Sequence, residues 1–105
     1  MAPGFMIVYA RITDAEQFRV YANAVGPLIA RFGGRLIGRT EAPQVLEGEF
    51  PWQTIGLLEF PSVRAARDFW NSPEYTNVKC LRAGAADFQV VLVEAIAIPA
   101  DASPG

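Results

Sequence analysis

Two segments of this chain carry apolar side chains on both faces of an extended backbone, and that pattern restricts the folds available to it. Alternate side chains of a strand point to opposite faces of a sheet. In residues 5–12 (FMIVYARI) and 88–98 (FQVVLVEAIAI), large apolar residues occupy both sets of positions. Such strands are buried on both faces, and the helices of one small chain cover only one face. The pattern therefore predicts a homodimer in which a second copy covers the other.

The order of the segments predicts an α+β fold. Runs rich in branched and aromatic residues predict four strands, at residues 5–12, 35–40, 53–60 and 88–98. Apolar residues recur with helical periodicity between the first and second strands, at residues 15–32, and between the third and fourth, at residues 63–70. The resulting β-α-β-β-α-β order is the ferredoxin-like plan, in which helices cover one face of an antiparallel sheet. Residues 1–98 are expected to form this single domain, and residues 99–105 a mobile tail.

Capping and breaking residues mark the ends of the helices. Asp14 and Ser62 are typical N-caps for the first and second helices. Gly33 is expected to end the first helix, because glycine readily adopts the left-handed conformation after a helix. Pro73 is placed to open a further short helix. Pro27 lies inside the first helix, and proline cannot donate the intrahelical bond, so a kink or a split is expected there.

The absence of histidine narrows the possible chemistry. Ser-His-Asp and Cys-His nucleophiles, His-ligated zinc and His-ligated haem are excluded within one type of chain. The single cysteine, Cys80, leaves no disulfide framework and no thiolate cluster. We therefore expect no metal and no other cofactor. Proton transfer is left to Asp, Glu, Tyr, Lys, Cys or water.

Charge and hydropathy exclude further classes. Lys and Arg total 9, the net charge is −2, and no basic run occurs, so no nucleic-acid partner is expected. No apolar run approaches the roughly 20 residues of a membrane span. The N-terminal residues lack the basic region of a signal peptide, so the cytoplasm is the expected location.

Three stretches of the chain resemble a known family. FGGRLIGRTEAPQVLEGEF, GLLEFPSVRAARDFWNSPEYTNVKCLRAGAA and VVLVEA look like a small bacterial family, domain of unknown function 1330 (DUF1330), of the dimeric α/β-barrel superfamily. The resemblance implies a homodimer whose two sheets close a barrel. It implies no particular activity, because relatives in that superfamily include cofactor-free monooxygenases, other enzymes and proteins without a known reaction. A shared fold does not transfer a function.

Carboxylates inside apolar strands are the first candidate site residues. Glu59 and Glu94 share strand faces with apolar neighbours, where desolvation would raise a carboxyl pKa toward that of a general base. They are the candidate catalytic residues. In the alternative interpretation, each sits at a strand end and pairs with Arg35, Arg39 or water.

Five further polar residues are candidates for binding a substrate: Tyr9, Arg39, Asn71, Tyr75 and Arg82. Arginine suits a planar anion. In the alternative interpretation, the segment around Asn71 only ends one helix and caps the next, and Tyr75 only packs. A site is expected between the bare sheet face and residues 71–82.

Two classes of function stay open. The first is a cofactor-independent enzyme acting on a small organic acid or carbonyl compound. The second is a dimer that binds a small ligand or is purely structural. A cavity of about 300 Å³ or more, lined by the candidate residues, would favour an enzyme or binder over a structural dimer.

Overall fold

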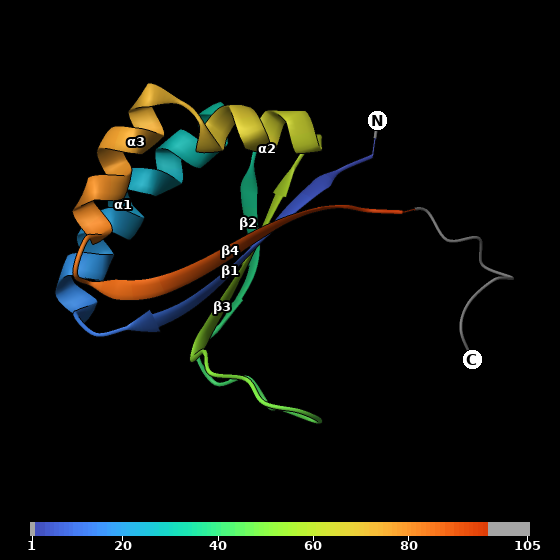
Figure 1. The fold of residues 1–105 in the computed structure, drawn as a ribbon. Coiled ribbons are helices and arrows are strands. Elements are labelled where there is room, and N and C mark those ends of the chain that lie inside the picture. The colour runs from blue at the N-terminus through green and yellow to red at the C-terminus, as the bar shows by residue number, and fades with distance from the viewer. Residues whose placement is uncertain (1, 97–105) are drawn as a thin grey trace, which may run out of the picture.

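A four-stranded antiparallel sheet carries the helices of this protein on one face (Figure 1). The computed structural model describes residues 2–96. Its elements are β1 (Gly4–Ile12), α1 (Ala15–Arg31), β2 (Arg35–Thr40), β3 (Thr54–Phe60), α2 (Val63–Trp70), α3 (Pro73–Lys79), the 3-10 turn η1 (Cys80–Arg82) and β4 (Ala86–Glu94). The strands lie in the order β2-β3-β1-β4, and each neighbouring pair is antiparallel.

The predicted α+β class with an antiparallel sheet is confirmed, and two details differ. The observed order adds α3 and η1 between α2 and β4, so it is not the simple β-α-β-β-α-β order. The sheet of one chain is open and does not close into a barrel. The face opposite the helices, called the open face below, is uncovered within the described residues (Figure 1).

Helix α1 begins and ends as its capping residues predict, but it is not split. The Asp14 carboxylate accepts a hydrogen bond from the backbone N–H of Gln17 at 3.1 Å. Gly33 ends the helix with a φ of 81°. Pro27 lies inside one continuous helix, so the predicted split is wrong. Because proline has no N–H, the carbonyl of Asn23, four residues earlier, loses its partner within the helix. Both residues are exposed, so water can bind that carbonyl instead.

The short helices are arranged by two serines. The Ser62 hydroxyl accepts from the backbone N–H of Ala65 and caps α2. The Ser72 hydroxyl accepts from the N–H of Tyr75 at 3.1 Å and donates to the carbonyl of Phe69 at 2.8 Å. It therefore joins the end of α2 to the start of α3, where Pro73 occupies the first turn. The predicted break between the two helices is confirmed.

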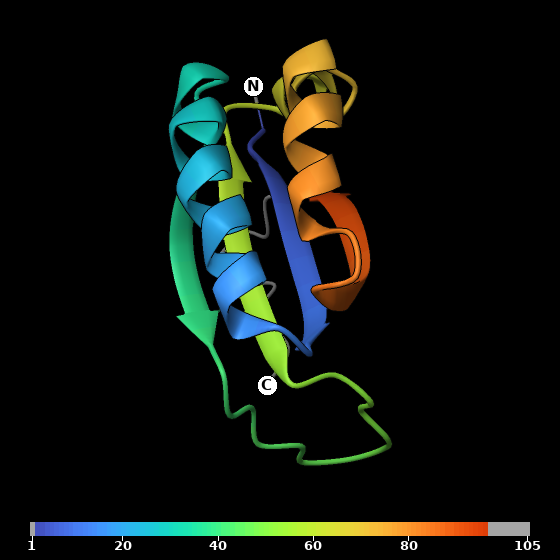
Figure 2. The ribbon, with the colours of Figure 1, turned by 90° about the vertical axis from the view of Figure 1, so that its left-hand side faces the viewer.

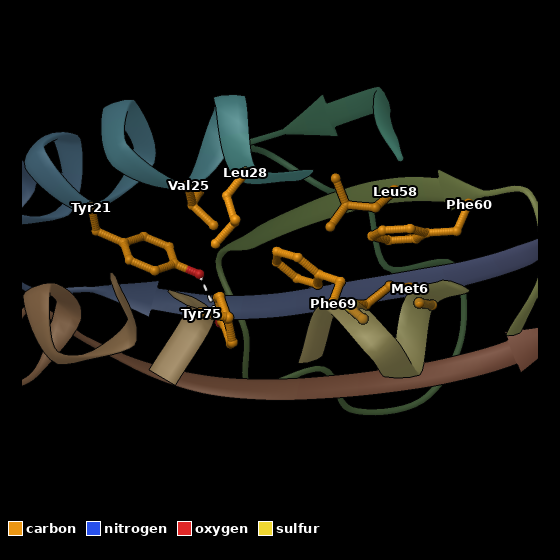
Figure 3. Packing of buried hydrophobic residues seen from close by; sticks show 9 residues of the cluster. Met6, Tyr21, Val25, Leu28, Leu58, Phe60, Phe69 and Tyr75 are labelled. Atoms are coloured by element: carbon orange, nitrogen blue, oxygen red, sulfur yellow. Dashed lines mark hydrogen bonds between the residues drawn. The ribbon is translucent and has the colours of Figure 1, made fainter. Parts of the chain in front are cut away.

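The core lies between the helices and the sheet and is largely aromatic. Its buried cluster is shown in Figure 3 and includes Met6, Tyr21, Val25, Leu28, Leu58, Phe60, Phe69 and Tyr75. Residues with even numbers in β1, such as Met6 and Ala10, point into this core. The faces of β1 are therefore arranged as its alternation predicts.

Strand β4 is shorter than predicted. It ends at Glu94, which pairs with Gly4, the first residue of β1, and one further bond runs from the N–H of Ala95 to the carbonyl of Pro3 at 3.2 Å. Residues 97–98 and the predicted mobile tail at 99–105 lie outside the described residues. No helix in the described range combines the length and apolar content needed to cross a bilayer.

Candidate functional site

Two neighbouring hollows lie along α1 and form the candidate site. The inner cleft, of about 190 Å³, separates α1 from the sheet and is lined by Val8, Tyr21, Ala22, Val25, Gly26, Ile29, Leu36, Gly56 and Leu58. The outer cleft, of about 330 Å³, lies near the start of α1 and is lined by Ile12, Ala15, Phe18, Arg19, Ala22, Asn23, Arg39 and Glu41. Both clefts have Ala22 in their lining, and the inner cleft is the more apolar of the two.

Small residues in α1 and β3 leave room for the inner cleft. A Cβ atom added at Gly56 would meet only the Cβ of Val8, at an ordinary 3.9 Å, and one added at Gly26 would meet nothing within 4 Å. Leu36 points to the helix side of β2, yet it remains 59% exposed because α1 does not cover this edge of the sheet. The cleft is therefore open toward β2.

A pair of buried tyrosines lies beside the inner cleft. The hydroxyls of Tyr21, on α1, and Tyr75, on α3, are 2.9 Å apart (Figure 3). The buried guanidinium of Arg82 stacks near the Phe88 ring, 4.0 Å from its centroid, and lies 5.5 Å from the Tyr21 ring. Among the described residues, no carboxylate forms a salt bridge with Arg82. Aromatic faces therefore hold this cation.

The environment of Tyr75 keeps its hydroxyl protonated. Burial raises the pKa of Tyr75 well above its ordinary value of 10.0, and the neighbouring Tyr21 raises it further, while Arg82 opposes the shift. Either hydroxyl can donate the hydrogen bond within the pair, and the hydroxyl that accepts it can donate to a further group. Tyr75 is thus suited to hydrogen bonding and not to acting as a base.

In Tyr75→Phe, the free energy of unfolding is expected to fall less steeply with rising pH than in the wild type. A folded-state pKa above the unfolded value means that the contribution of Tyr75 is fully present below about pH 10. It declines as the pH rises past that point, because only the unfolded chain then releases the proton. Urea unfolding between pH 9 and 11.5 should show a smaller decline in the variant. Equal declines in both proteins would contradict the assignment. At pH 7, the lost hydrogen bond should lower stability by about 1 kcal/mol.

The two candidate catalytic carboxylates lie away from the clefts. Glu59 is on the open face, where Arg35 donates to it from β2 at 2.7 and 3.0 Å. Glu94 is exposed at the end of β4. These positions agree with the alternative interpretation, in which carboxylates at strand ends pair with arginine or water. The catalytic roles of Glu59 and Glu94 remain predictions.

The five candidate binding residues are divided between the two sides of the sheet. Tyr9 lies on the open face, with its ring 5.8 Å from the Phe50 ring. Arg39 lines the outer cleft and donates to Glu41. The other three, Asn71, Tyr75 and Arg82, lie on the helix side. Residues 71–82 therefore do not face the open face, and the predicted location of the site is wrong. Of the five, Tyr75 and Arg82 lie together beside Tyr21.

Sequence reasoning missed Tyr21 and Gly56. Tyr21 was indistinguishable from the other apolar residues of the α1 stripe, because its hydroxyl partner lies 54 positions away. Gly56 did carry a signal, since glycine inside a strand often marks a place where something approaches the backbone closely. Within residues 2–96, no group of three or more His, Cys, Asp or Glu side chains is placed to hold a metal ion.

Comparisons with known proteins place the chain in a family and support its fold. Residues 3–96 match the family model described as domain of unknown function (DUF1330). None of the curated proteins matches the chain. A solved protein of unknown function from Rhodopseudomonas palustris is 22% identical with a TM-score of 0.77, and the alignment covers 92% of this chain and 85% of that one.

Two further solved structures share the fold at lower identity. A cofactor-independent oxygenase from Streptomyces nogalater is 14% identical with a TM-score of 0.65, covering 93% of this chain and 97% of that one. A dimeric ferredoxin-like protein of unknown function from Thermobifida fusca is 13% identical with a TM-score of 0.58, covering 90% and 92%. At these identities the likeness shows the fold alone.

Proposed function

Because the chain belongs to the DUF1330 family, whose description assigns no function, its role must be argued from its own residues, and we propose that it is a homodimeric small-molecule-binding protein. Each protomer binds one small, largely apolar organic molecule in the inner cleft. The polar end of that molecule, a carbonyl or carboxylate, contacts the tyrosine pair or points to the outer cleft.

The observation that carries this proposal is the inner cleft itself. Its walls are apolar apart from Tyr21, and it shares Ala22 with the outer cleft of about 330 Å³. Small-molecule sites are commonly of about 300–1,000 Å³, with apolar walls and a few polar groups that orient the ligand. The inner cleft, at about 190 Å³, is smaller than this range and has the apolar walls, whereas the outer cleft reaches the range and contains Arg39, one of the candidate residues.

The charged groups nearby favour an organic acid or carbonyl compound. Arg19 and Arg39 line the outer cleft, together with a single carboxylate, that of Glu41. A carboxylate ligand there would compete with Glu41 for the guanidinium of Arg39, a bidentate donor for planar anions. A carbonyl oxygen in the inner cleft would instead accept a hydrogen bond from the tyrosine hydroxyl that does not donate within the pair.

Gly56→Val is expected to abolish binding without weakening the fold. The new side chain would point into the inner cleft, while its Cβ makes only an ordinary contact with Val8. Valine also favours a strand more than glycine does. A thermal-shift screen of small organic acids and carbonyl compounds would identify those that stabilise the wild type. At 100 times its Kd, such a compound adds about 2.7 kcal/mol of stability, and this gain should vanish in the variant.

Gly38→Val is the matched control for this experiment. Gly38 pairs with Leu57 on the open face, and an added Cβ would lie 3.7 Å from the Leu57 side chain. The same substitution therefore adds a valine outside the cleft and should leave compound binding unchanged. Undiminished binding by Gly56→Val would show that the compounds bind elsewhere.

Cofactor-independent catalysis on the same class of compound is a second candidate. The observation that favours it is the tyrosine pair, since a neutral hydroxyl in a water-poor site can polarise a carbonyl. Glu59 and Glu94, the candidate bases, lie away from the clefts, so in this proposal the tyrosine hydroxyls and not these carboxylates act on the bound compound. Conversion of a bound compound by the purified protein, followed by mass spectrometry, distinguishes an enzyme from a binder.

The homodimer is supported by the composition of the open face. Its apolar side chains come from three strands, and they are Phe5, Ile7, Tyr9, Ile55, Leu57, Val91 and Val93. Soluble monomers rarely leave a large contiguous apolar surface uncovered. A second sheet seated on this face would close the barrel that the family resemblance implies. The solved Thermobifida fusca protein, which shares the fold, is described as dimeric.

A further inference from the structure

The loop between β2 and β3, residues 41–53 and called the arm below, projects beyond the end of the sheet. Figures 1 and 2 show it in green, leaving the body of the protein, and Figure 1 shows it turning toward the side opposite the helices. Leu46, near its tip, is 92% exposed. Nothing among the described residues covers this side chain, so its apolar surface has no role within one protomer.

The base of the arm is attached to the end of β1. The backbone N–H of Gln53 donates to the carbonyl of Ala10 at 3.1 Å, and the Arg11 guanidinium donates to the carbonyl of Pro51 at 3.2 Å. The same guanidinium lies 5.7 Å from the ring centroid of Trp52. These contacts set the direction of the arm before any partner binds, which reduces the entropy lost on binding.

The inner side of the arm is concave and continuous with the open face. A hollow of about 410 Å³ is lined by residues of the arm, including Leu46 and Phe50, and by Ile55 of β3. Ile55 pairs with Tyr9 on the open face, and the Tyr9 ring contacts the Phe50 ring edge-on. The lining is mixed: Leu46, Phe50 and Ile55 give it apolar side chains from the tip of the arm to the sheet, and Glu47 and Glu49 line it as well.

We propose that the arm clasps the second protomer of the dimer, with Leu46 buried against the partner. This inference rests on the proposed homodimer, because the hollow opens onto the face that the second sheet would cover. In a two-fold symmetric dimer the same contact occurs twice, once for each arm. The arm carries Glu41, Glu47 and Glu49 and no Lys or Arg. Two such arms would repel each other, so each contacts the body of the partner and not its arm.

Leu46→Glu tests the proposal by placing a charge at the tip of the arm. We expect the dimer Kd to rise about tenfold or more, as for loss of a central apolar contact. Sedimentation equilibrium of the full chain over a range of concentrations measures this. Val20→Glu is the matched control, because Val20 is 51% exposed on α1 and lines none of the clefts. It should leave the Kd unchanged, and circular dichroism should show both variants folded.

The possible results separate this inference from the homodimer itself. A wild-type mass of 11.4 kDa at every concentration would overturn both. A wild-type dimer whose Kd is unchanged by Leu46→Glu, or weakened equally by Val20→Glu, would overturn the role of the arm alone. The role of the arm would also be overturned if Leu46→Glu left the dimer Kd unchanged but abolished binding of the apolar dye ANS. The hollow would then be a small-molecule site and not a contact with the partner.

Discussion

Replacing Phe69 with alanine is expected to lower the free energy of unfolding by about 3–5 kcal/mol, the usual range for deleting a buried aromatic side chain. Phe69 is 2% exposed. Its ring centroid lies 4.6 Å from that of Tyr75, 5.5 Å from that of Phe60 and 5.9 Å from that of Phe32. The cavity left by the substitution would adjoin α1, α3 and the sheet at once. Because small domains have about 5–15 kcal/mol of stability, much of the total would be lost.

Urea denaturation at a fixed protein concentration measures this loss, since folding and dimerisation are coupled in a homodimer. Val20→Ala is the control, because Val20 is half-exposed on α1 and lies outside the core cluster. Its effect should stay within about 0.5 kcal/mol. A loss below about 1.5 kcal/mol for Phe69→Ala would mean that the aromatic cluster is not packed as described.

Leu57→Lys is expected to dissociate the proposed homodimer, raising its Kd by about 100-fold or more. Leu57 lies on the open face and is 37% exposed in a single protomer, so a lysine there is tolerated by the fold. In a symmetric interface the substitution appears on both protomers and brings two like charges into one apolar contact. Like-charge contacts of this kind weaken association by several kcal/mol, and 1.4 kcal/mol corresponds to a factor of ten.

Val20→Lys on the outer side of α1 is the matched control and should not affect assembly. Sedimentation velocity would show the wild type at twice 11.4 kDa and Leu57→Lys at 11.4 kDa. If Leu57→Lys remained a dimer as tight as the wild type, the open face would not be the interface. The dimer would then have to form through another surface, and the inference about the arm would fail with it.

Local signals in the sequence were sufficient for most of the fold. The caps at Asp14, Ser62 and Ser72 involve hydrogen bonds over three positions, so a short window of sequence contains both partners. The alternation in β1 correctly placed Met6 toward the helices, because strand periodicity needs no knowledge of the partner. Pro27 was the exception. A local rule predicted a kink or a split, but Pro27 and Asn23, whose carbonyl loses its partner, are both exposed on one continuous helix, which only the packing of α1 reveals.

The candidate site was predicted less well because its residues are distant in sequence. Glu59 was named as a candidate base and, in the alternative, as a partner of Arg35, Arg39 or water, and only the pairing of β2 with β3 selects Arg35. Tyr75 and Arg82 were named, yet the partner that gives them a chemical environment, Tyr21, is on another helix. No spacing within one segment could have joined these three.

The sequence by itself determined the strands, the helix caps, the antiparallel α+β class and the presence of strands with two apolar faces. Each depends on residues a few positions apart or on a simple period. Only the tertiary structure decided where space remains between α1 and the sheet. That space depends on Ala22 and Gly26 of α1 facing Val8 and Gly56 of neighbouring strands. The sizes of side chains from three elements decide together whether a cleft or a filled core results, and no single segment contains that information.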